Sequence, residues 1–262
     1  MAEIETAKGP VTRNRVRSSL SAFFNFLIRE GLLNVSPVAG TGTADEVRSR
    51  ERVLTDAELA EVWRGLRDDR FGNIVRLLIL TGQRRDEIGS LRLSEVDLER
   101  ELIVLPPDRT KNKRQHEVPL SKQAKAILER AINGAKSSSV IKGSSATALG
   151  VNDTKVFGGF LGYHDRKGWL DQQIKLKEPW RLHDLRRTAA TGMADKLGVL
   201  PHIVEAILNH VSGHRAGVAG IYNRAKYENE MRDALQRWSD YIEGLTAKPL
   251  SSQPQQGQGL AY

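Results

Sequence analysis

The chain has 262 residues, and its 40 Lys and Arg against 32 Asp and Glu give a net charge of +8. This length accommodates one or two domains with a sizeable core, and the basic balance favours a polyanionic partner such as a nucleic acid. The absence of cysteine excludes disulfides, thiol nucleophiles and cysteine-held zinc. No apolar run reaches the roughly 18 residues of a membrane span and no secretory signal begins the chain, so we expect a cytoplasmic protein with no membrane partner.

The first region of the chain predicts one long helix followed by a linker. Residues 11–33 carry apolar side chains at three- and four-residue steps, and Gly31 is a plausible end of that helix. A single helix cannot bury its own apolar stripe, so it has to pack on the rest of the chain or on another protein. Proline and glycine make residues 34–50 a predicted linker.

A second region begins with a strong helix signal. Thr55 and Glu58 match a capping box, and the residues that follow have the apolar spacing of a buried helix face. The apolar stretch 74–80 ends at Gly82, which we predict to be a left-handed helix cap. Arg84 therefore lies just beyond a buried helix, at the start of the next short one.

The middle of the chain predicts a β-hairpin. Residues 101–105 and 117–120 have the composition of strands, and the polar residues between them form a turn. Ser121 can cap a following helix, and residues 134–150, rich in Ser and Gly, are predicted to form a loose surface insertion.

Helical character resumes after Trp180. Further helices are predicted near 202–208 and 227–242, and residues 251–262 have the composition of a disordered tail. The expected fold class is therefore mainly α with a small antiparallel β-sheet (α+β).

Widely separated arginines and histidines, followed by a tyrosine, indicate a nucleophile aimed at an anion. Arginine forks fit phosphate oxygens, histidine moves protons or donates a hydrogen bond, and a phenol can form a covalent phosphodiester. The residues concerned are Arg84, His183, Arg186, His210 and Tyr222. This combination indicates DNA strand cleavage without a metal.

Considered singly, each of these residues has a plainer interpretation. Arg84 can pair with an acidic neighbour such as Glu87 on the surface, the more frequent role of an isolated arginine. His183 and Arg186 lie on one helix face, where a histidine more often makes a structural hydrogen bond. Tyr222 alone is most often a core or interface tyrosine.

His210 and His214 lie four residues apart, a spacing that also occurs between metal ligands, so a metal site has to be considered. Zinc would need a third protein ligand, and His202 is the nearest other histidine in the sequence. No HExxH motif is present, and no carboxylate cluster accompanies the histidines, which disfavours a metal-dependent nuclease. We therefore expect neither a metal nor another cofactor.

The order of the motifs is more specific than any one of them. Residues 81–87 read T-G-x-R-x-x-E, and Lys111 follows on the predicted hairpin. His183 and Arg186 then make an H-x-x-R motif. A Leu-Asn-His segment at 208–210 precedes Tyr222, which lies in Tyr-Asn-Arg.

This series resembles the catalytic domain of the tyrosine recombinases, also called the phage integrase family, and its ending is most like prophage and genomic-island integrases. The match spans about residues 50–245. Asn209 departs from the pattern, because the family usually has glycine before this histidine. The resemblance implies three parts. Residues 1–45 would be a remnant of a helical core-binding domain with its linker, residues 46–245 the catalytic domain, and residues 246–262 a disordered tail.

The resemblance implies a covalent reaction at a DNA phosphate. Tyr222 attacks the phosphorus and forms a 3′-phosphotyrosine, while Arg84 and Arg186 hold the non-bridging oxygens. Lys111 protonates the leaving 5′-oxygen, with Lys113 as the rival on the same turn. The covalent bond conserves the phosphodiester energy, so no ATP is required.

The same resemblance implies supporting roles for three further side chains. His183 assists proton transfer with the tyrosine, whose ordinary pKa near 10 makes such help necessary at neutral pH. His210 donates a hydrogen bond to a phosphate oxygen. Glu87 orients the arginine cluster from behind.

The implied partner is a double-stranded DNA attachment site, bound by a homotetramer that is a monomer when free. Two other functions stay open on the residues alone. A type IB topoisomerase-like relaxing enzyme uses similar residues and differs by its product, relaxed circles instead of recombinant junctions. A non-catalytic DNA-binding regulator would not need the tyrosine, the lysine and both arginines.

Overall fold

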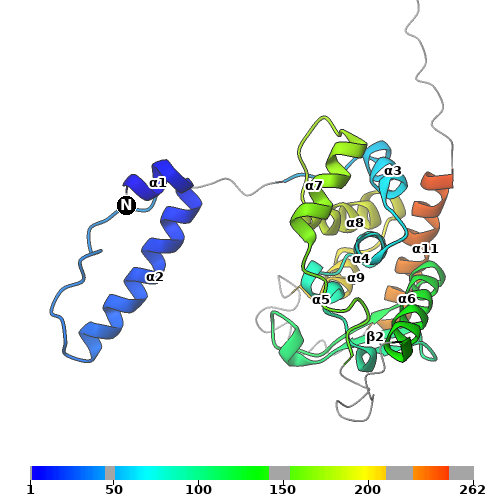
Figure 1. Cartoon of the computed structure of the whole chain (residues 1–262), viewed down its shortest axis with the longest axis horizontal. Helices are drawn as coiled ribbons and strands as arrows, with labels where there is room; N and C mark the ends of the chain where they lie inside the picture. Colours follow the sequence, from blue (N-terminus) through cyan, green and yellow to red (C-terminus); the bar gives the residue numbers. More distant parts are fainter. Residues whose placement is uncertain (1, 45–50, 142–153, 211–226, 248–262) are drawn as a thin grey trace, which may run out of the picture. The chain divides into compact units, whose positions relative to one another are not determined.

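The computed structural model describes residues 2–44, 51–141, 154–210 and 227–247 (Figure 1). The chain divides into two compact units, Met1–Glu51 and Arg52–Tyr262. The second unit contains all of the main hydrophobic core and the described candidate site residues. None of the described helices has the length and apolarity that crossing a membrane requires.

The first unit consists of two helices followed by a non-helical segment that extends to residue 44. Helix α1 (Ala2–Lys8) was not predicted, whereas α2 (Pro10–Arg29) matches the expected long helix and ends before Gly31, whose φ is 71°. Within the predicted linker, the stretch 41–44 hydrogen-bonds to α2. The Asn14 side chain accepts the backbone N–H of Ala44 at 2.8 Å.

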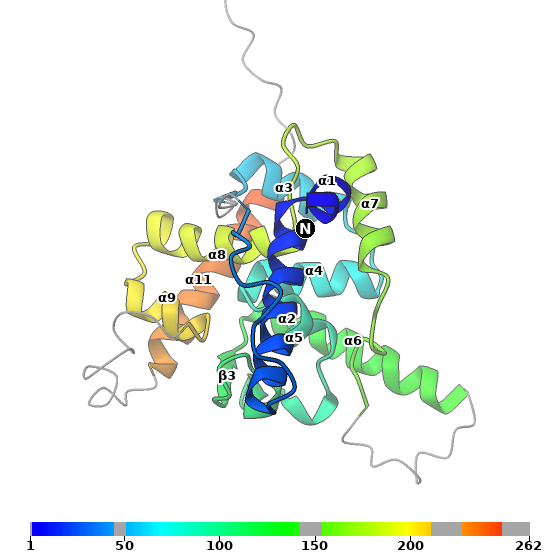
Figure 2. The ribbon, with the colours of Figure 1, turned by 90° about the vertical axis from the view of Figure 1, so that its left-hand side faces the viewer.

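The second unit has eight described helices and a small sheet. The helices are α3 (Asp56–Gly65), α4 (Arg70–Thr81), α5 (Arg85–Gly89), α6 (Lys122–Ile141), α7 (Tyr163–Ile174), α8 (Leu182–Leu197), α9 (Pro201–Ile207) and α11 (Glu228–Ala247). Two short 3-10 turns, η1 (Leu93–Glu95) and η2 (Pro107–Arg109), flank the sheet. Figure 2 shows α8, α9 and α11 gathered on one side of this unit, with α6 and α7 toward the other.

Local signals explain where several of these helices begin and end. Thr55 and Glu58 form the predicted capping box at the start of α3, and Gly82 ends α4 with a φ of 64°. The Ser121 hydroxyl accepts the backbone N–H of Ala124 at 3.2 Å and so caps α6, as predicted. These contacts satisfy helix-end groups that have no partner within the helix.

The predicted hairpin is confirmed and is joined by a third strand. Strands β2 (Leu102–Leu105) and β3 (His116–Pro119) pair antiparallel, with Leu102 opposite Pro119 and Leu105 opposite His116. The short β1 (Val96–Asp97) adds to the other edge of β2. The fold is mainly helical with a small antiparallel sheet, as the sequence predicted.

Two expectations about helices were wrong. Residues 134–141 are not part of a loose insertion, because α6 continues through Ile141; the rest of that segment, 142–153, lies outside the described residues. Extending a formed helix costs far less than starting one, which offsets the weak helix propensity of serine. Helix α7 was missed, because Leu170 is its one buried residue and its sequence has no apolar stripe.

Helix α4 lies at the centre of the core. Its apolar residues from Ile74 to Leu80 are almost fully buried, and α6, α8 and α11 pack around it. The indole N–H of Trp238 on α11 donates to the Ile79 carbonyl oxygen at 2.8 Å. The C-terminal end of α4, and with it the chain segment through Arg84, is therefore fixed by packing on several sides.

Candidate functional site

The junction between α4 and α5 presents Arg84. This residue is the N-cap of α5, and Glu87 holds it twice: one carboxylate oxygen accepts the backbone N–H at 3.0 Å, the other accepts from the guanidinium at 2.9 Å. Glu87 is only 3% exposed. The simple pairing considered for Arg84 thus exists, but it is a buried contact that orients the guanidinium and not a surface ion pair.

Arg186 is brought to the same place by α8. Its guanidinium donates to the Gly82 carbonyl oxygen at 2.9 Å and to the Leu208 carbonyl oxygen, and the residue is buried. These contacts with neutral groups fix the side chain while leaving its charge uncompensated by them, and a guanidinium has further N–H donors for a ligand.

The surroundings of Arg186 make its positive charge energetically unfavourable. Burial, and then the nearby positive charge of Arg84, lower the pKa of Arg186 to about 10, while Glu87 acts in the opposite direction. The group stays protonated at neutral pH because this value is well above 7. An anion bound between the two arginines would relieve the repulsion, which makes the cluster a suitable anion site.

His183 lies one helical turn before Arg186 on α8, and its side chain is exposed. Although the ring reaches solvent, the surrounding protein displaces part of its hydration, and this desolvation, with the positive charges of Arg186 and Arg187, lowers the pKa of His183 below its ordinary value. The imidazole is therefore mainly neutral at pH 7 and able to accept a proton.

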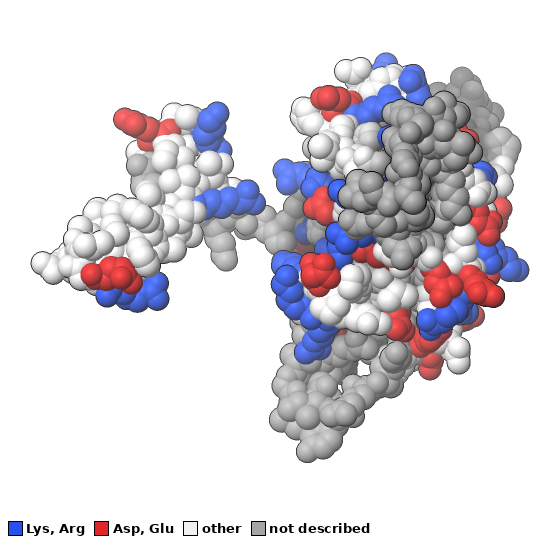
Figure 3. Space-filling model, turned by 60° about the horizontal axis from the view of Figure 1, so that its bottom comes forward, with Lys and Arg blue, Asp and Glu red and all other residues white. Residues whose placement is uncertain are grey.

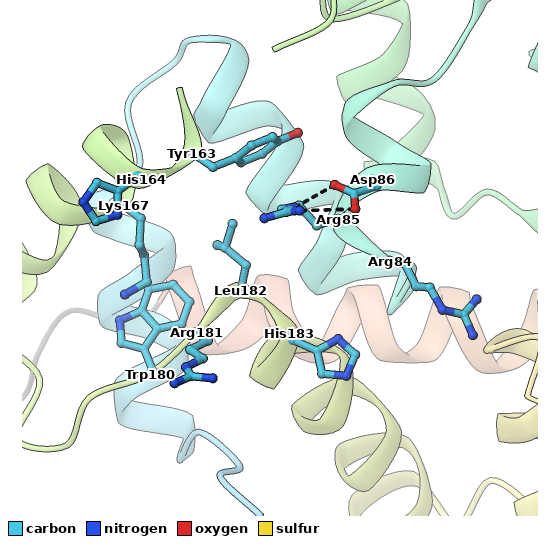
Figure 4. A pocket seen from close by; sticks show the side chains of 10 residues that line it. All are labelled: Arg84, Arg85, Asp86, Tyr163, His164, Lys167, Trp180, Arg181, Leu182 and His183. Carbon is cyan, nitrogen blue, oxygen red and sulfur yellow. Dashed lines mark hydrogen bonds and ion pairs between the residues drawn. The ribbon is translucent and has the colours of Figure 1, made fainter. Parts of the chain in front are cut away.

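Arg84 and His183 line a pocket of about 560 Å³ whose other walls come from α5, α7 and the start of α8 (Figure 4). Six basic or imidazole side chains line it, against a single acid: Arg84, Arg85, His164, Lys167, Arg181 and His183, with Asp86. That acid is itself paired with Arg85 at 2.8 Å. Two more of these cations are paired with acids, Arg84 with Glu87 at 2.9 Å and Lys167 with Asp171 at 2.6 Å. The pocket shares Arg84 with the arginine cluster.

Lys111 and His210 lie at neighbouring chain segments, and both side chains are exposed. Lys111 is in the turn between β2 and β3, and His210 lies three residues after Ile207, the last residue of α9. The chain neighbours of these two residues are in contact. The amide of Asn112, which follows Lys111, donates to the side-chain oxygen of Asn209, which precedes His210, at 2.6 Å.

Asn209 preserves the helix end where the family usually has glycine. Its φ is 48°, and it sits where the chain leaves α9 with two hydrogen bonds, Asn209 N–H to Ala206 and His210 N–H to Glu205. This is the left-handed helix ending that glycine favours and asparagine tolerates. The departure from the family pattern therefore keeps, before His210, a left-handed backbone that glycine would also adopt.

Sequence reasoning missed two residues that tie the site together. The Gln83 amide N–H₂ donates to the carbonyl oxygens of Thr81 and Ile207, at 2.9 and 2.8 Å, so its oxygen must face His116 Nε2, 3.1 Å away. Both Gln83 and His116 are buried. This chain of contacts links α4, α9 and β3, and no local pattern could have revealed it.

Arg109 was also missed, although it anchors the start of the Lys111 turn. Its guanidinium contacts the buried Glu95 at 2.8 Å, the Ser90 hydroxyl at 2.8 Å and the Glu87 carbonyl oxygen at 3.1 Å. The turn is thereby attached to α5, the helix that carries Glu87.

Two candidate residues lie outside the described residues: Tyr222 and His214. Within the part of the chain that the structure describes, no group of three or more His, Asp or Glu residues is arranged to hold a metal ion. Figure 3 shows Lys and Arg interspersed with Asp and Glu over the face it draws.

Solved structures with the same fold are integrases. An integrase of the transposon Tn1549, in complex with transposon right end DNA, superposes with a TM-score of 0.59 at 18% identity over 91% of this chain and 83% of that chain. A lambda integrase dimer bound to a COC′ core site gives a TM-score of 0.58 at 16% identity, over 80% and 76% of the two chains.

Sequence comparison gives the family. The model of the phage integrase family matches residues 64–229, which is more than half of the chain. The chain therefore belongs to the phage integrase family, as the ordered motifs indicated.

Individual relatives are distant. The prophage integrase IntZ of Escherichia coli K12 is 27% identical over 91% of this chain, and the tyrosine recombinase XerC of Lactobacillus delbrueckii subsp. bulgaricus is 26% identical over 76% of it. The matched part spans 57% of IntZ and 68% of XerC.

Proposed function

We propose that this chain carries the catalytic part of a site-specific DNA recombinase that cleaves and rejoins DNA through a 3′-phosphotyrosine. The observation that carries the proposal is the convergence of Arg84 and Arg186 at the end of α4, with His183 one turn away. Two arginines held by a buried carboxylate and by backbone carbonyls suit a phosphate with two non-bridging oxygens. Membership in the phage integrase family supports the same assignment.

In the proposed reaction the phenolic oxygen of Tyr222 attacks the scissile phosphorus. The Tyr–O–P bond forms as the P–O5′ bond breaks, the phenolic proton passes to neutral His183, and the 5′-oxygen takes a proton from Lys111. Arg84 and Arg186 balance the extra negative charge of the five-coordinate transition state, and His210 donates to a phosphate oxygen. Attack by a 5′-hydroxyl reverses each step and rejoins the strand.

The proposed partner is a double-stranded DNA attachment site in a bacterial cell, so the protein would act in the cytoplasm at the nucleoid. We propose a homotetramer on DNA that is a monomer when free. One structural neighbour gives some support, since it is a lambda integrase tetramer bound to a Holliday junction.

Covalent capture tests the proposal. The protein is incubated with a pool of randomised duplexes, each nicked in one strand, so that cleavage near the nick releases a short fragment and traps the enzyme on DNA. We expect an adduct that forms in excess EDTA and maps to Tyr222, and none with Tyr222→Phe, which removes only the nucleophilic oxygen. Mapping to Tyr227, or adduct formation by the phenylalanine variant, would overturn the assignment.

The same captured site separates the alternatives. A site-specific recombinase gives recombinant junctions from two plasmids that carry it, whereas a topoisomerase-like enzyme only relaxes supercoiled circles. Binding without any adduct would indicate a non-catalytic regulator. Loss of cleavage in EDTA with rescue by zinc or magnesium would indicate a metal-dependent nuclease.

A further inference from the structure

The turn that carries Lys111 is held to α9 by a reciprocal amide pair. The Asn112 N–H₂ donates to the Asn209 side-chain oxygen at 2.6 Å, and the Asn209 N–H₂ donates back to the Asn112 oxygen at 3.2 Å. The Asn112 amide also approaches the Asn209 carbonyl oxygen at 3.3 Å. Asparagine is suited to this contact because its side chain has both a donor and an acceptor.

The backbone of α9 does not by itself require asparagine at 209. Glycine adopts a φ of 48° without strain, and is the usual residue at such a helix ending. The amide of Asn209 is nevertheless buried against the turn, with the residue only 7% exposed. Its side chain therefore serves the contact with Asn112 beyond what the helix end needs.

Other contacts already hold the base and the shape of the turn. Arg109 anchors its start on Glu95, and His116 at its end is tied to Gln83. Within the turn, the Thr110 hydroxyl donates to the Arg114 carbonyl oxygen at 2.7 Å. The amide pair is thus placed to control where the tip of the turn lies, with the hairpin itself supported independently.

We propose that Asn112 and Asn209 are positioning residues that set Lys111 relative to His210. Each asparagine is the chain neighbour of one of these side chains, so the pair fixes the two segments as one unit. With the pair formed, both side chains act on the same phosphate: the Lys111 ammonium protonates the leaving oxygen, and the His210 imidazole donates to a non-bridging oxygen. This inference rests on the proposed function, in which Lys111 is the general acid.

Two variants break the pair from opposite sides. Asn112→Ala removes one amide from the turn, together with the bond that its oxygen accepts from the Arg114 backbone N–H at 3.2 Å. Asn209→Gly removes the other amide while keeping the left-handed backbone and that contact within the turn, so it is the cleaner test of the pair. Gln115→Ala is the matched control, because it removes an exposed amide of the same turn that contacts Glu117 instead of α9. Circular dichroism and thermal unfolding establish that each variant is folded.

The decisive measurement is how the cleavage rate of each variant depends on the leaving group. Adduct formation is timed on the nicked duplex selected by the wild-type protein, made once with the ordinary 5′-oxygen and once with sulfur in its place. A thiolate leaves without protonation, so a misplaced acid matters only for the oxygen substrate. We expect Asn112→Ala and Asn209→Gly to slow cleavage of the oxygen substrate by on the order of tenfold to a hundredfold, and to cleave the sulfur substrate at nearly the wild-type rate.

Combining variants tests whether the residues act together. The double variant of Asn112 and Asn209 should be no slower than either single one, and adding Asn112→Ala to Lys111→Ala should cost nothing further. Gln115→Ala should behave as wild type on both substrates.

The failure of this inference differs from the failure of the proposed function. If sulfur rescues Lys111→Ala, but Asn112→Ala and Asn209→Gly are slowed equally on both substrates or not at all, the positioning role is wrong. If sulfur does not rescue Lys111→Ala itself, Lys111 is not the general acid, and the inference falls with that assignment.

Discussion

Glu87 controls the arginine cluster at the scale of a single side chain. It is buried, and its two carboxylate oxygens are used separately, one on the Arg84 backbone and one on the Arg84 guanidinium. Its negative charge also favours the protonated form of Arg186, which is held by carbonyl oxygens. One carboxylate thus stabilises two charges that would otherwise repel each other.

Replacing Glu87 with glutamine should weaken both the fold and the reaction. The amide keeps one acceptor, loses the charge and turns an N–H₂ group toward donors, so we expect the free energy of unfolding to fall by about 1–3 kcal/mol. Adduct formation should slow as well, because Arg84 loses its fixed orientation. Asp86→Asn is the control: that exposed carboxylate pairs with Arg85, and its loss should cost less than about 0.5 kcal/mol. Equal costs in urea unfolding would contradict the role given to Glu87.

His116 makes stability depend on pH. Burial lowers the pKa of this imidazole to about 4 from an ordinary value of 6.5. Between these two values the unfolded chain binds a proton that the folded chain does not, so protonation favours unfolding. Stability is fully present above pH 6.5 and is lost as the pH falls toward 4.

We expect His116→Gln to remove this contribution. Glutamine still offers an N–H to the Gln83 oxygen but does not titrate. The wild-type protein should lose about 3 kcal/mol more than the variant between pH 6.5 and 4, at about 1.4 kcal/mol per pH unit. Urea unfolding of both proteins across this range gives the difference, and parallel curves would show that His116 does not titrate as described.

At the scale of elements, α8 and α11 approach closely at Gly192. A Cβ atom at this position would lie 2.4 Å from the Trp238 ring, far inside van der Waals contact. The ring has little freedom to move, because Trp238 is 1% exposed and its N–H is bonded to Ile79 on α4. The packing of three helices that position Arg186 and Arg84 therefore depends on the absence of a side chain at 192.

Gly192→Ala should destabilise the protein even though alanine favours helix. Overpacking of this kind costs about 1–3 kcal/mol. Gly168→Ala is the matched control in α7: nothing lies within 4 Å of the added Cβ, and the higher helix propensity should stabilise by up to about 1 kcal/mol. Thermal or denaturant unfolding measures both, and the same sign of change in the two variants would contradict the close approach.

At the scale of the whole molecule, the two units differ in what they bury. The hydrophobic core comes entirely from residues of the second unit, from Leu54 onward. In the described part of the first unit only Val38 and Ala44 are buried apolar residues, while Phe23 and Phe26 are about half exposed, at 54% and 48%. The second unit thus has the core of an independent domain, and the first does not.

Removing residues 1–51 should leave the main unfolding transition nearly unchanged. We expect a midpoint within a few degrees of the full chain, and we expect the isolated 1–51 segment to show no cooperative transition. Calorimetry of the three proteins checks both statements. A large drop in the midpoint on truncation would show that the second unit depends on the first for its stability.

The sequence alone determined the features that short-range signals encode. The capping box at Thr55, the left-handed cap at Gly82 and the strand pair 101–105 with 117–120 were predicted because their determinants lie within a few residues of one another. The family was recognisable for a similar reason, since each motif is a short, ordered string of residues. Helix α7 was not predicted because its sequence lacks an apolar period, the main signal that indicates a helix in a sequence.

Only the tertiary structure decided how the candidate site is held. The contacts Gln83–His116, Asn112–Asn209 and Arg186–Gly82 join residues that are 33, 97 and 104 positions apart in the chain. Two of these residues, Gln83 and Asn112, occupy positions that the motif leaves free or does not include. A hydrogen bond across such a separation leaves no periodic trace in the sequence, because its partners are chosen by the packing of α4, α8 and α9 and not by their neighbours along the chain.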